Sequence, residues 1–246
     1  TILKSAREQR IDRIGISGGD GSIHHFFNAL MKIGFRPTTF IMPTGSANDF
    51  ARSIGLIDWP SSVAAFESGS PKSFDVMKTS DDRFVINALT GSVSAIINER
   101  MTDEVKSFWG RFSYARVTAE LINEAPNYIT RVTIDGRRFD APASAVIVAN
   151  GRGAGGLELV PSADPSDGLL DVVLVRATDL NKRLEALAMF AAGRQLESEH
   201  LEHVRGTHVK IESAPPMPLM ADGDEFGETP IELSIVSRAL NICIPS

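Results

Sequence analysis

The chain has 246 residues, of which 43% are hydrophobic and 23% are charged, and its formal net charge at pH 7 is -6. This length allows one large domain or two modest ones, and the acidic balance argues against a broad surface for binding nucleic acid. A single cysteine, Cys243, excludes an internal disulfide and a cysteine-based zinc site, and it fits a reducing cytoplasm.

The first predicted elements are a short helix and a β-branched strand over 11–17, which ends in a glycine-rich turn. That turn consists of Gly18, Gly19, Asp20, Gly21 and Ser22, and an apolar-periodic helix follows it. Glycines let backbone N–H groups approach an anion, and a helix N-terminus favours negative charge. Because a carboxylate would repel phosphate, Asp20 is best interpreted as part of a Mg²⁺ site. An ordinary strand-to-helix turn is the alternative.

A second loop of similar character follows the next strand. The spacing predicts a helix over 23–34 and a strand over 38–43, and Thr44, Gly45, Ser46, Ala47, Asn48 and Asp49 come after them. Strand, helix and strand form a βαβ unit, so both strands should end at the same edge of a parallel sheet. We therefore expect the two loops to face one crevice. Helix capping by Asn48 or Asp49 is the alternative, and it need not exclude ligand binding.

The rest of the chain changes character near residues 69–83. Before this break we expect a helix over 61–67, with Pro60 at its start. After it we expect helices over 111–124 and 179–192, and strands over 84–88, 128–134, 145–149, 169–175, 208–211 and 231–235. We thus predict a small parallel α/β domain over 1–77 and a β-rich domain over 78–246, whose last strand can return to the first domain. No run approaches the roughly 20 apolar residues that span a bilayer, and we expect no signal peptide.

The glycines at 151, 153 and 156 satisfy a G-x-G-x-x-G pattern after a predicted strand. A dinucleotide-binding site also requires a helix immediately after the glycines. Pro161 and Pro165 interrupt the segment that would have to form this helix. The pattern is therefore not interpreted as a Rossmann fingerprint.

Two acidic loops are the remaining candidates for metal-binding or catalytic sites. Asp164 and Asp167 lie in a turn-rich loop, and two carboxylates with a backbone carbonyl suit Mg²⁺; an Asx-turn that opens the next strand is the alternative. Asp222-Gly223-Asp224 offers carboxylates that could orient an attacking hydroxyl, and an acidic surface hairpin is the alternative.

Taken together, the motifs resemble the diacylglycerol kinase and sphingosine kinase superfamily, especially its bacterial lipid-kinase branch. The resemblance rests on ordered segments spread over nearly the whole chain: 18–22, 43–51, 149–156, 161–172, 222–224, 227–230 and 238–240. It implies a nucleotide-binding α/β domain like those of NAD kinases and diacylglycerol kinases, followed by a sandwich-like β domain. NAD kinases share only the Gly-Gly-Asp-Gly element and rank second.

The resemblance implies an ATP- and Mg²⁺-dependent kinase that phosphorylates a hydroxyl of a diacylglycerol-like lipid. The glycine loop and Ser46 would hold the phosphates, while Asp20, Asp49 and Asp75 would organise metal. Asp164, Asp167 and the carbonyl of Leu169 would hold a structural Mg²⁺, and Asp222 or Asp224 would serve as the general base. It further implies a cytoplasmic enzyme that meets its lipid at the membrane surface, with a homodimer as one option.

Three features depart from the family pattern. His24 and His25 stand where the family usually has Asn-Glu, and Asp224 stands where it usually has Glu. Asp is one methylene shorter, and a misplacement of roughly 1 Å can cost about 10²-fold in rate. The sequence also begins at Thr1, without the earlier strands and Asn-Pro loop of the family, which indicates a fragment or an incomplete nucleotide domain. A non-catalytic lipid- or nucleotide-binding relative is therefore the competing hypothesis. Phe108-Trp109 could help to admit acyl chains, although core packing is the alternative.

Overall fold

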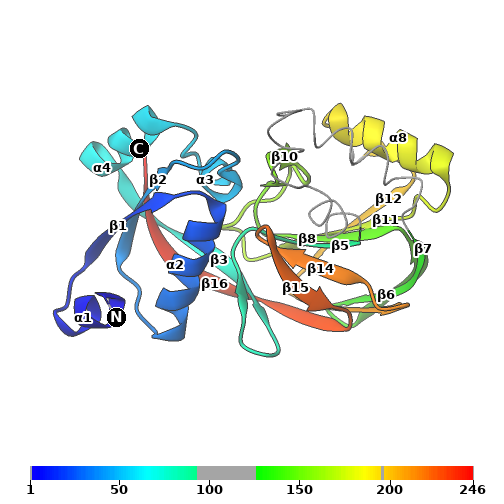
Figure 1. Ribbon diagram of the computed structural model, residues 1–246, viewed down its shortest axis with the longest axis horizontal. Helices are drawn as coiled ribbons and strands as arrows, with labels where there is room; N and C mark the ends of the chain where they lie inside the picture. The colour runs from blue at the N-terminus through cyan, green and yellow to red at the C-terminus, as the bar shows by residue number, and fades with distance from the viewer. Residues whose placement is uncertain (1, 93–125, 195–196, 246) are drawn as a thin grey trace, which may run out of the picture. The chain divides into compact units, whose positions relative to one another are not determined.

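The computed structural model describes residues 2–92, 126–194 and 197–245, and the chain divides into two compact units (Figure 1). The first unit contains Thr1–Ala88, Ala149–Leu170 and Leu233–Ser246, and the second contains Leu89–Val148 and Asp171–Glu232. The first unit thus draws on three separate parts of the sequence. The helix expected over 111–124 and the Phe108-Trp109 pair lie outside the described residues.

The first unit begins with the predicted βαβ arrangement. Helix α1 (Ile2–Glu8) precedes β1 (Arg13–Gly18), α2 (Asp20–Lys32) and β2 (Thr38–Pro43). Strands β1 and β2 are parallel, in a register that runs from Arg13 opposite Thr38 to Gly18 opposite Pro43. Helix α2 begins at Asp20 and not at Ile23 as expected, because the glycine turn already adopts helical geometry and only Gly19 before it is extended. The acidic residue of the motif therefore lies in the first turn of a helix.

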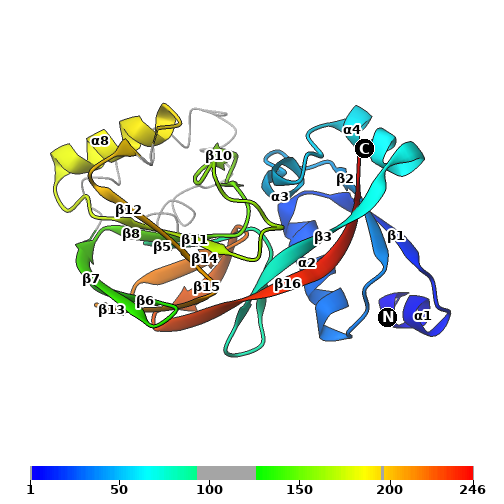
Figure 2. The same ribbon diagram turned by 180° about the vertical axis from the view of Figure 1, so that it is seen from behind.

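Two helices and three strands complete the main part of this unit. They are α3 (Asp49–Ser53), α4 (Trp59–Ser68), β3 (Ser70–Thr79), β4 (Phe84–Val85) and β16 (Ile231–Ile244). Strand β16 lies antiparallel along β3 for most of its length, as Figure 2 shows, and its end pairs in parallel with β2. The segment where the composition changes therefore contains a strand of ten residues.

A core of aromatic side chains joins the helices to the sheet. Phe27, Phe50 and Phe74 are almost fully buried and come from α2, α3 and β3. The rings of Phe27 and Phe50 meet edge to face with centroids 6.1 Å apart, and those of Phe50 and Phe74 with centroids 6.5 Å apart. This packing holds α2 and α3, the helices that carry the candidate acidic residues, against β3.

The second unit is β-rich. Antiparallel β6 (Tyr128–Ile134), β7 (Arg137–Ala143) and β13 (His208–Ala214) lie side by side, and a second sheet has the order β12-β11-β8-β5-β14-β15. The strands of the second sheet are β5 (Ala88–Ser92), β8 (Ala145–Ala149), β11 (Leu170–Val175), β12 (Leu201–Gly206), β14 (Pro218–Ala221) and β15 (Asp224–Glu228). Helix α8 (Leu180–Ala191) is capped by Asp179, as expected.

The two-part fold expected from the sequence is thus confirmed, with a parallel α/β part and a sandwich-like β part. Strands β7 and β12 were missed because charged residues, and a proline in β7, interrupt their apolar pattern. Within the described ranges, no helix combines the length and the apolar character needed to cross a membrane.

Candidate nucleotide and metal site

The two glycine loops lie against each other at the ends of β1 and β2. A Cβ atom placed on Gly45 would stand 2.5 Å from the Cα of Gly19. The N–H of Thr44 also donates to the carbonyl of Gly18 at 3.0 Å. The backbones approach so closely that position 45 has no room for a side chain. The parallel sheet therefore brings the loops together at one edge, as the carboxyl ends of neighbouring parallel strands require.

Asn48 closes the second loop on itself. Its Oδ1 accepts the N–H of Gly45 at 2.9 Å, and its Nδ2 donates to the carbonyl of Gly45 at 2.7 Å. Asn48 precedes α3 in the left-handed region, with φ 53°, and its side chain does not cap that helix. The capping interpretation of Asn48 is therefore not what the structure shows. Its side chain holds Gly45 in place beside Gly19.

Asp20 and Asp49 are the acidic groups of these loops. Oδ1 of Asp20 accepts the N–H of Phe50 at 3.3 Å, which links the first turn of α2 to the first turn of α3. Asp49 is only 8% exposed. Burial raises the pKa of the Asp49 carboxyl above its ordinary value, and the negative charge of Asp20 raises it further, while N–H groups of Gly156 and Gly155 oppose both effects. Two carboxylates that repel each other in a half-buried place suit a divalent cation.

The segment with the G-x-G-x-x-G pattern forms a hairpin. Strands β9 (Gly153–Ala154) and β10 (Leu157–Glu158) are antiparallel, and Gly155 and Gly156 form the turn with φ of 64° and 81°. Positive φ at both central residues is the requirement of a type I′ hairpin turn, which explains the glycines. Residues 153–158 therefore form no helix, in agreement with the sequence argument. The N–H of Gly156 instead donates to both Oδ1 and Oδ2 of Asp49, at 3.0 and 3.1 Å.

Asp75 uses both carboxylate oxygens on backbone groups. Its Oδ2 accepts the N–H of Gly168 at 2.8 Å, and its Oδ1 accepts the N–H of Arg238 at 2.6 Å. The N–H of Asp75 donates to the carbonyl of Pro165 at 2.7 Å, and the side chain is only 1% exposed. Arg238 has a positive φ at an irregularity in the pairing of β16 with β3. Asp75 therefore ties three segments of the first unit together.

The loop of Asp164 and Asp167 makes the local bonds of Asx-turns. Oδ1 of Asp164 accepts from the N–H of Ser166 at 2.9 Å and from its hydroxyl at 2.6 Å, and Oδ1 of Asp167 accepts the N–H of Leu169 at 3.0 Å. Although partial burial opposes it, the bonds from Ser166 and the charges of Lys72 and Arg152 lower the pKa of Asp164. An ionised Asp164 is what a metal ligand must be. The loop thus combines the Asx-turn geometry with a donor set that suits Mg²⁺.

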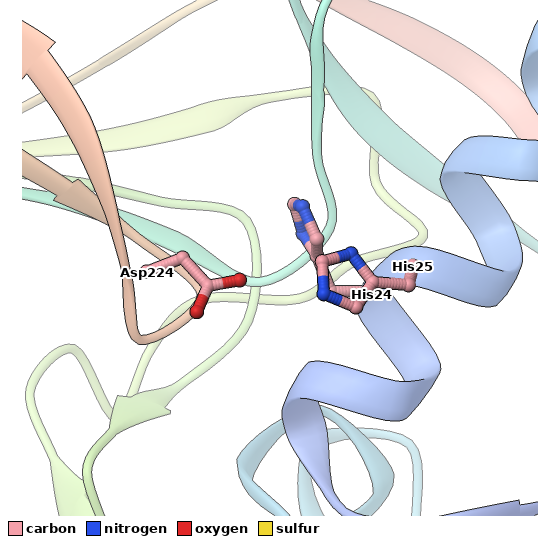
Figure 3. Close-up of side chains that lie close together, drawn as sticks. All are labelled: His24, His25 and Asp224. Atoms are coloured by element: carbon pink, nitrogen blue, oxygen red, sulfur yellow. The ribbon is translucent and has the colours of Figure 1, made fainter.

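Asp222 and Asp224 belong to the second unit. Asp222 and Gly223 form the two-residue turn between β14 and β15, with φ of 50° and 95°. The backbone therefore forms the acidic hairpin that the sequence offered as an alternative. Asp222 is half-buried in it, and Asp224 is exposed. Figure 3 labels Asp224, the first residue of β15, and it labels His24 and His25 on α2.

The two histidines lie in the first half of α2. Their rings meet edge to face with centroids 5.4 Å apart, and Nε2 of His24 lies 3.3 Å from Nδ2 of Asn28. Asn28 also exchanges two bonds with the backbone of Phe84, which fastens α2 to β4. Sequence reasoning missed Asn28, and it also missed Asn87, a single polar residue within the apolar run 84–88. A lone amide in the strand predicted over 84–88 is the signal that could have found Asn87. The structure divides that predicted strand into β4 and β5, and Asn87 lies in the bend between them.

Comparison with known proteins places this geometry in a family. The model of the diacylglycerol kinase catalytic domain matches residues 1–79, and that of the YegS C-terminal NAD kinase beta sandwich-like domain matches residues 88–244. The diacylglycerol kinase of Bacillus subtilis (strain 168) is 24% identical over 245 residues, which cover 98% of this chain and 80% of that protein. A candidate lipid kinase of the YegS-like type from Chromohalobacter salexigens is 28% identical over 249 residues, which cover 99% and 79%.

The fold has a counterpart of known structure. A crystal structure of a candidate diacylglycerol kinase from Bacillus anthracis str. Sterne superposes with a TM-score of 0.81, at 24% identity, over 98% of this chain and 80% of that chain. This likeness confirms the α/β part and the sandwich-like β part. The two domain matches show that the chain belongs to the family of bacterial diacylglycerol kinases and YegS-like lipid kinases.

Proposed function

We propose that the protein is an ATP- and Mg²⁺-dependent lipid kinase that phosphorylates a hydroxyl of a diacylglycerol-like lipid. The observation that carries this proposal is the pairing of Asp20 and Asp49 beside two glycine loops that touch at Gly19 and Gly45. Backbone N–H groups next to acidic side chains are what a metal-bound polyphosphate needs. Family membership supports kinase chemistry, and the names of the relatives support a lipid acceptor.

In this proposal Gly18–Ser22, Gly45 and Ser46 hold the phosphates of ATP. Asp20 and Asp49 hold the Mg²⁺ that accompanies ATP, and Asp164, Asp167 and the carbonyl of Leu169 hold a second, structural Mg²⁺. Bound Mg²⁺ would neutralise charge on the phosphates during transfer. Asp75 holds the metal-binding loop by accepting a hydrogen bond from the N–H of Gly168, and it is itself held to β16 by the N–H of Arg238.

The chemical step transfers the γ-phosphoryl group from ATP to the lipid oxygen. The O–H bond of the lipid breaks as its oxygen bonds to phosphorus, the bond between phosphorus and the β,γ-bridging oxygen breaks, and ADP leaves. Asp222 or Asp224 accepts the proton. A carboxylate suffices because phosphoryl transfer depends mainly on positioning and charge stabilisation.

The same proposal assigns different binding roles to the two parts of the chain and a cellular location to the enzyme. Residues 1–77 bind the nucleotide and residues 78–246 bind the lipid, except that the loop of Asp164 and Asp167, which folds with the first unit, holds the structural Mg²⁺. We further propose that the enzyme acts from the cytoplasm at the membrane surface, where ATP and a lipid hydroxyl meet. A homodimer is compatible with this arrangement.

Incubation with γ-labelled ATP, Mg²⁺ and a panel of lipids in mixed micelles tests the proposal. We expect label in a diacylglycerol-like lipid, and at least about 10²-fold less in the Asp20→Asn and Asp222→Asn variants. Asp12→Asn, which changes an exposed acid of the first unit in the same way, should transfer like the wild type. If the wild type transfers no more labelled phosphate to lipid than Asp20→Asn does, the kinase proposal is wrong. Retained ATP binding in that case would favour the non-catalytic relative, to which the shorter Asp224 also points.

A further inference from the structure

The turn of the β9–β10 hairpin holds the Asp49 carboxylate. In a two-residue hairpin, the N–H groups of the two turn residues are not used in pairing the strands. Here these residues are Gly155 and Gly156, and the N–H of Gly156 lies 3.0 and 3.1 Å from the two oxygens of Asp49. Successive backbone N–H groups in a turn can form a concave site for an anion. The place of the Asp49 carboxylate therefore depends on where the hairpin lies.

Asn87 fixes the start of this hairpin. It is 5% exposed, and its Nδ2 donates to the carbonyl of Gly153. The backbone carbonyl of Asn87 accepts the N–H groups of Asn150 at 2.8 Å and of Gly151 at 2.9 Å. A Cβ atom on Gly151 would stand 1.9 Å from Oδ1 of Asn87, so the amide fills the space that the glycine leaves. One residue thus holds the hairpin through both its side chain and its backbone.

Ser53 holds the opposite side of the hairpin. Its Oγ accepts the N–H of Arg152 at 2.9 Å and donates to the carbonyl of Asp49 at 2.9 Å. Both attachments lie next to Asp49 and neither involves its carboxylate. The hairpin is therefore fixed at its base by Asn87 and beside α3 by Ser53, and its turn is directed at the carboxylate.

We propose that Asn87 is a positioning residue that sets the place of the Asp49 carboxylate through Gly153 and the turn of the hairpin. Removal of its amide leaves the buried carbonyl of Gly153 without this donor, and the hairpin shifts to regain a partner. The kinetic consequence of this inference rests on the proposed function. The structural consequence does not, and the two can be measured separately.

The structural consequence is tested with the Asn87→Ala variant by ¹H–¹⁵N spectra of the full chain. An N–H that donates to a carboxylate has its proton resonance shifted downfield. We expect the Gly156 resonance of Asn87→Ala to move upfield, towards its position in Asp49→Ala, and the double variant to show no further movement. Asn241→Ala is the matched control, because Nδ2 of Asn241 makes a bond to Oγ1 of Thr38, at 3.5 Å, in the same unit. It should leave Gly156 unmoved.

The kinetic consequence is a fall in kcat of about 10- to 100-fold in Asn87→Ala, with the KM for the lipid unchanged, because a displacement of about 1 Å is enough. Asn241→Ala should keep the kcat of the wild type. If Asn87→Ala does not fold, Ser53→Ala should move Gly156 in the same direction by a smaller amount.

An unmoved Gly156 resonance in Asn87→Ala, or in Ser53→Ala where that variant has to be used, would overturn the inference, and so would an equal movement in Asn241→Ala. If Gly156 moves as expected while the wild type transfers no phosphate, the positioning of Asp49 stands and the proposed function fails. If the wild type transfers phosphate while Gly156 stays in place, the reverse holds.

Discussion

Asp49 is a single residue whose buried position lowers the stability of the fold when its carboxyl is ionised. Its carboxylate is buried, it faces the charge of Asp20, and two glycine N–H groups offset only part of the penalty, so its pKa is raised. Groups held in such unfavourable environments are found mainly at functional sites. The sequence pointed to Asp49 as part of a motif, but its carboxylate accepts a hydrogen bond from Gly156, which lies 107 residues further along the chain. No local pattern carries that information.

The raised pKa of Asp49 predicts a pH-dependent gain in stability for Asp49→Asn. The folded state holds the proton more tightly than the unfolded state, so the ionised carboxyl destabilises the fold once the pH exceeds 3.8, the ordinary pKa of an aspartate. Asn carries no charge and keeps one oxygen to accept from Gly156. Urea unfolding between about pH 4 and pH 8 should show Asp49→Asn gaining stability over the wild type as pH rises, while transfer activity is lost.

Asp12→Asn provides the matched control for that titration, since the side chain of Asp12 is exposed. Its difference in stability from the wild type should not rise with pH. An Asp49→Asn variant that is less stable than the wild type across the whole range would contradict this electrostatic account.

At the scale of elements, the local patterns predicted more than the long-range pairings. Strands 128–134 and 145–149 were predicted with the observed bounds, because apolar alternation and apolar runs are local signals. Strand β3 was not predicted, since its first residues are polar or proline and its burial comes from pairing with β16. The hairpin at 153–158 could be inferred only in part: the prolines excluded a helix, but the partner of its turn was not visible in the sequence.

Asp75 yields a prediction at this scale, because it joins β3, the loop at 165–168 and β16. In Asp75→Asn, one of the two oxygens becomes an N–H₂ group that faces a backbone N–H donor. We expect the free energy of unfolding to fall by about 2 kcal/mol or more, the usual result of leaving a buried donor unsatisfied. Chemical denaturation followed by circular dichroism measures this loss.

A direct cofactor contact at Asp75 would give a different result. Asp75→Asn would then weaken nucleotide or metal binding and leave the stability of the ligand-free protein unchanged. That outcome would return Asp75 to the role expected from the resemblance.

For the whole molecule, the order of motifs along the sequence predicted a two-part chain of the lipid-kinase type, and the fold and the family are confirmed. The folded first unit, however, draws on residues 149–170 and 233–246 as well as on the N-terminal part. The parallel pairing of Asn241 with Thr38 joins positions near the two ends of the chain. Such contacts arise from the packing of the whole sheet and have no counterpart in local spacing.

The central claim is that the two glycine loops with Asp20 and Asp49 bind a metal-bound nucleotide. A crystal of the protein with Mn²⁺ and a non-hydrolysable ATP analogue, measured for anomalous scattering, tests it most directly. We predict an anomalous peak within ligand distance of Asp20 or Asp49, with the analogue's phosphates against the N–H groups of Gly18–Ser22 and Gly45. An analogue bound elsewhere, with no metal at these two carboxylates, would contradict the account.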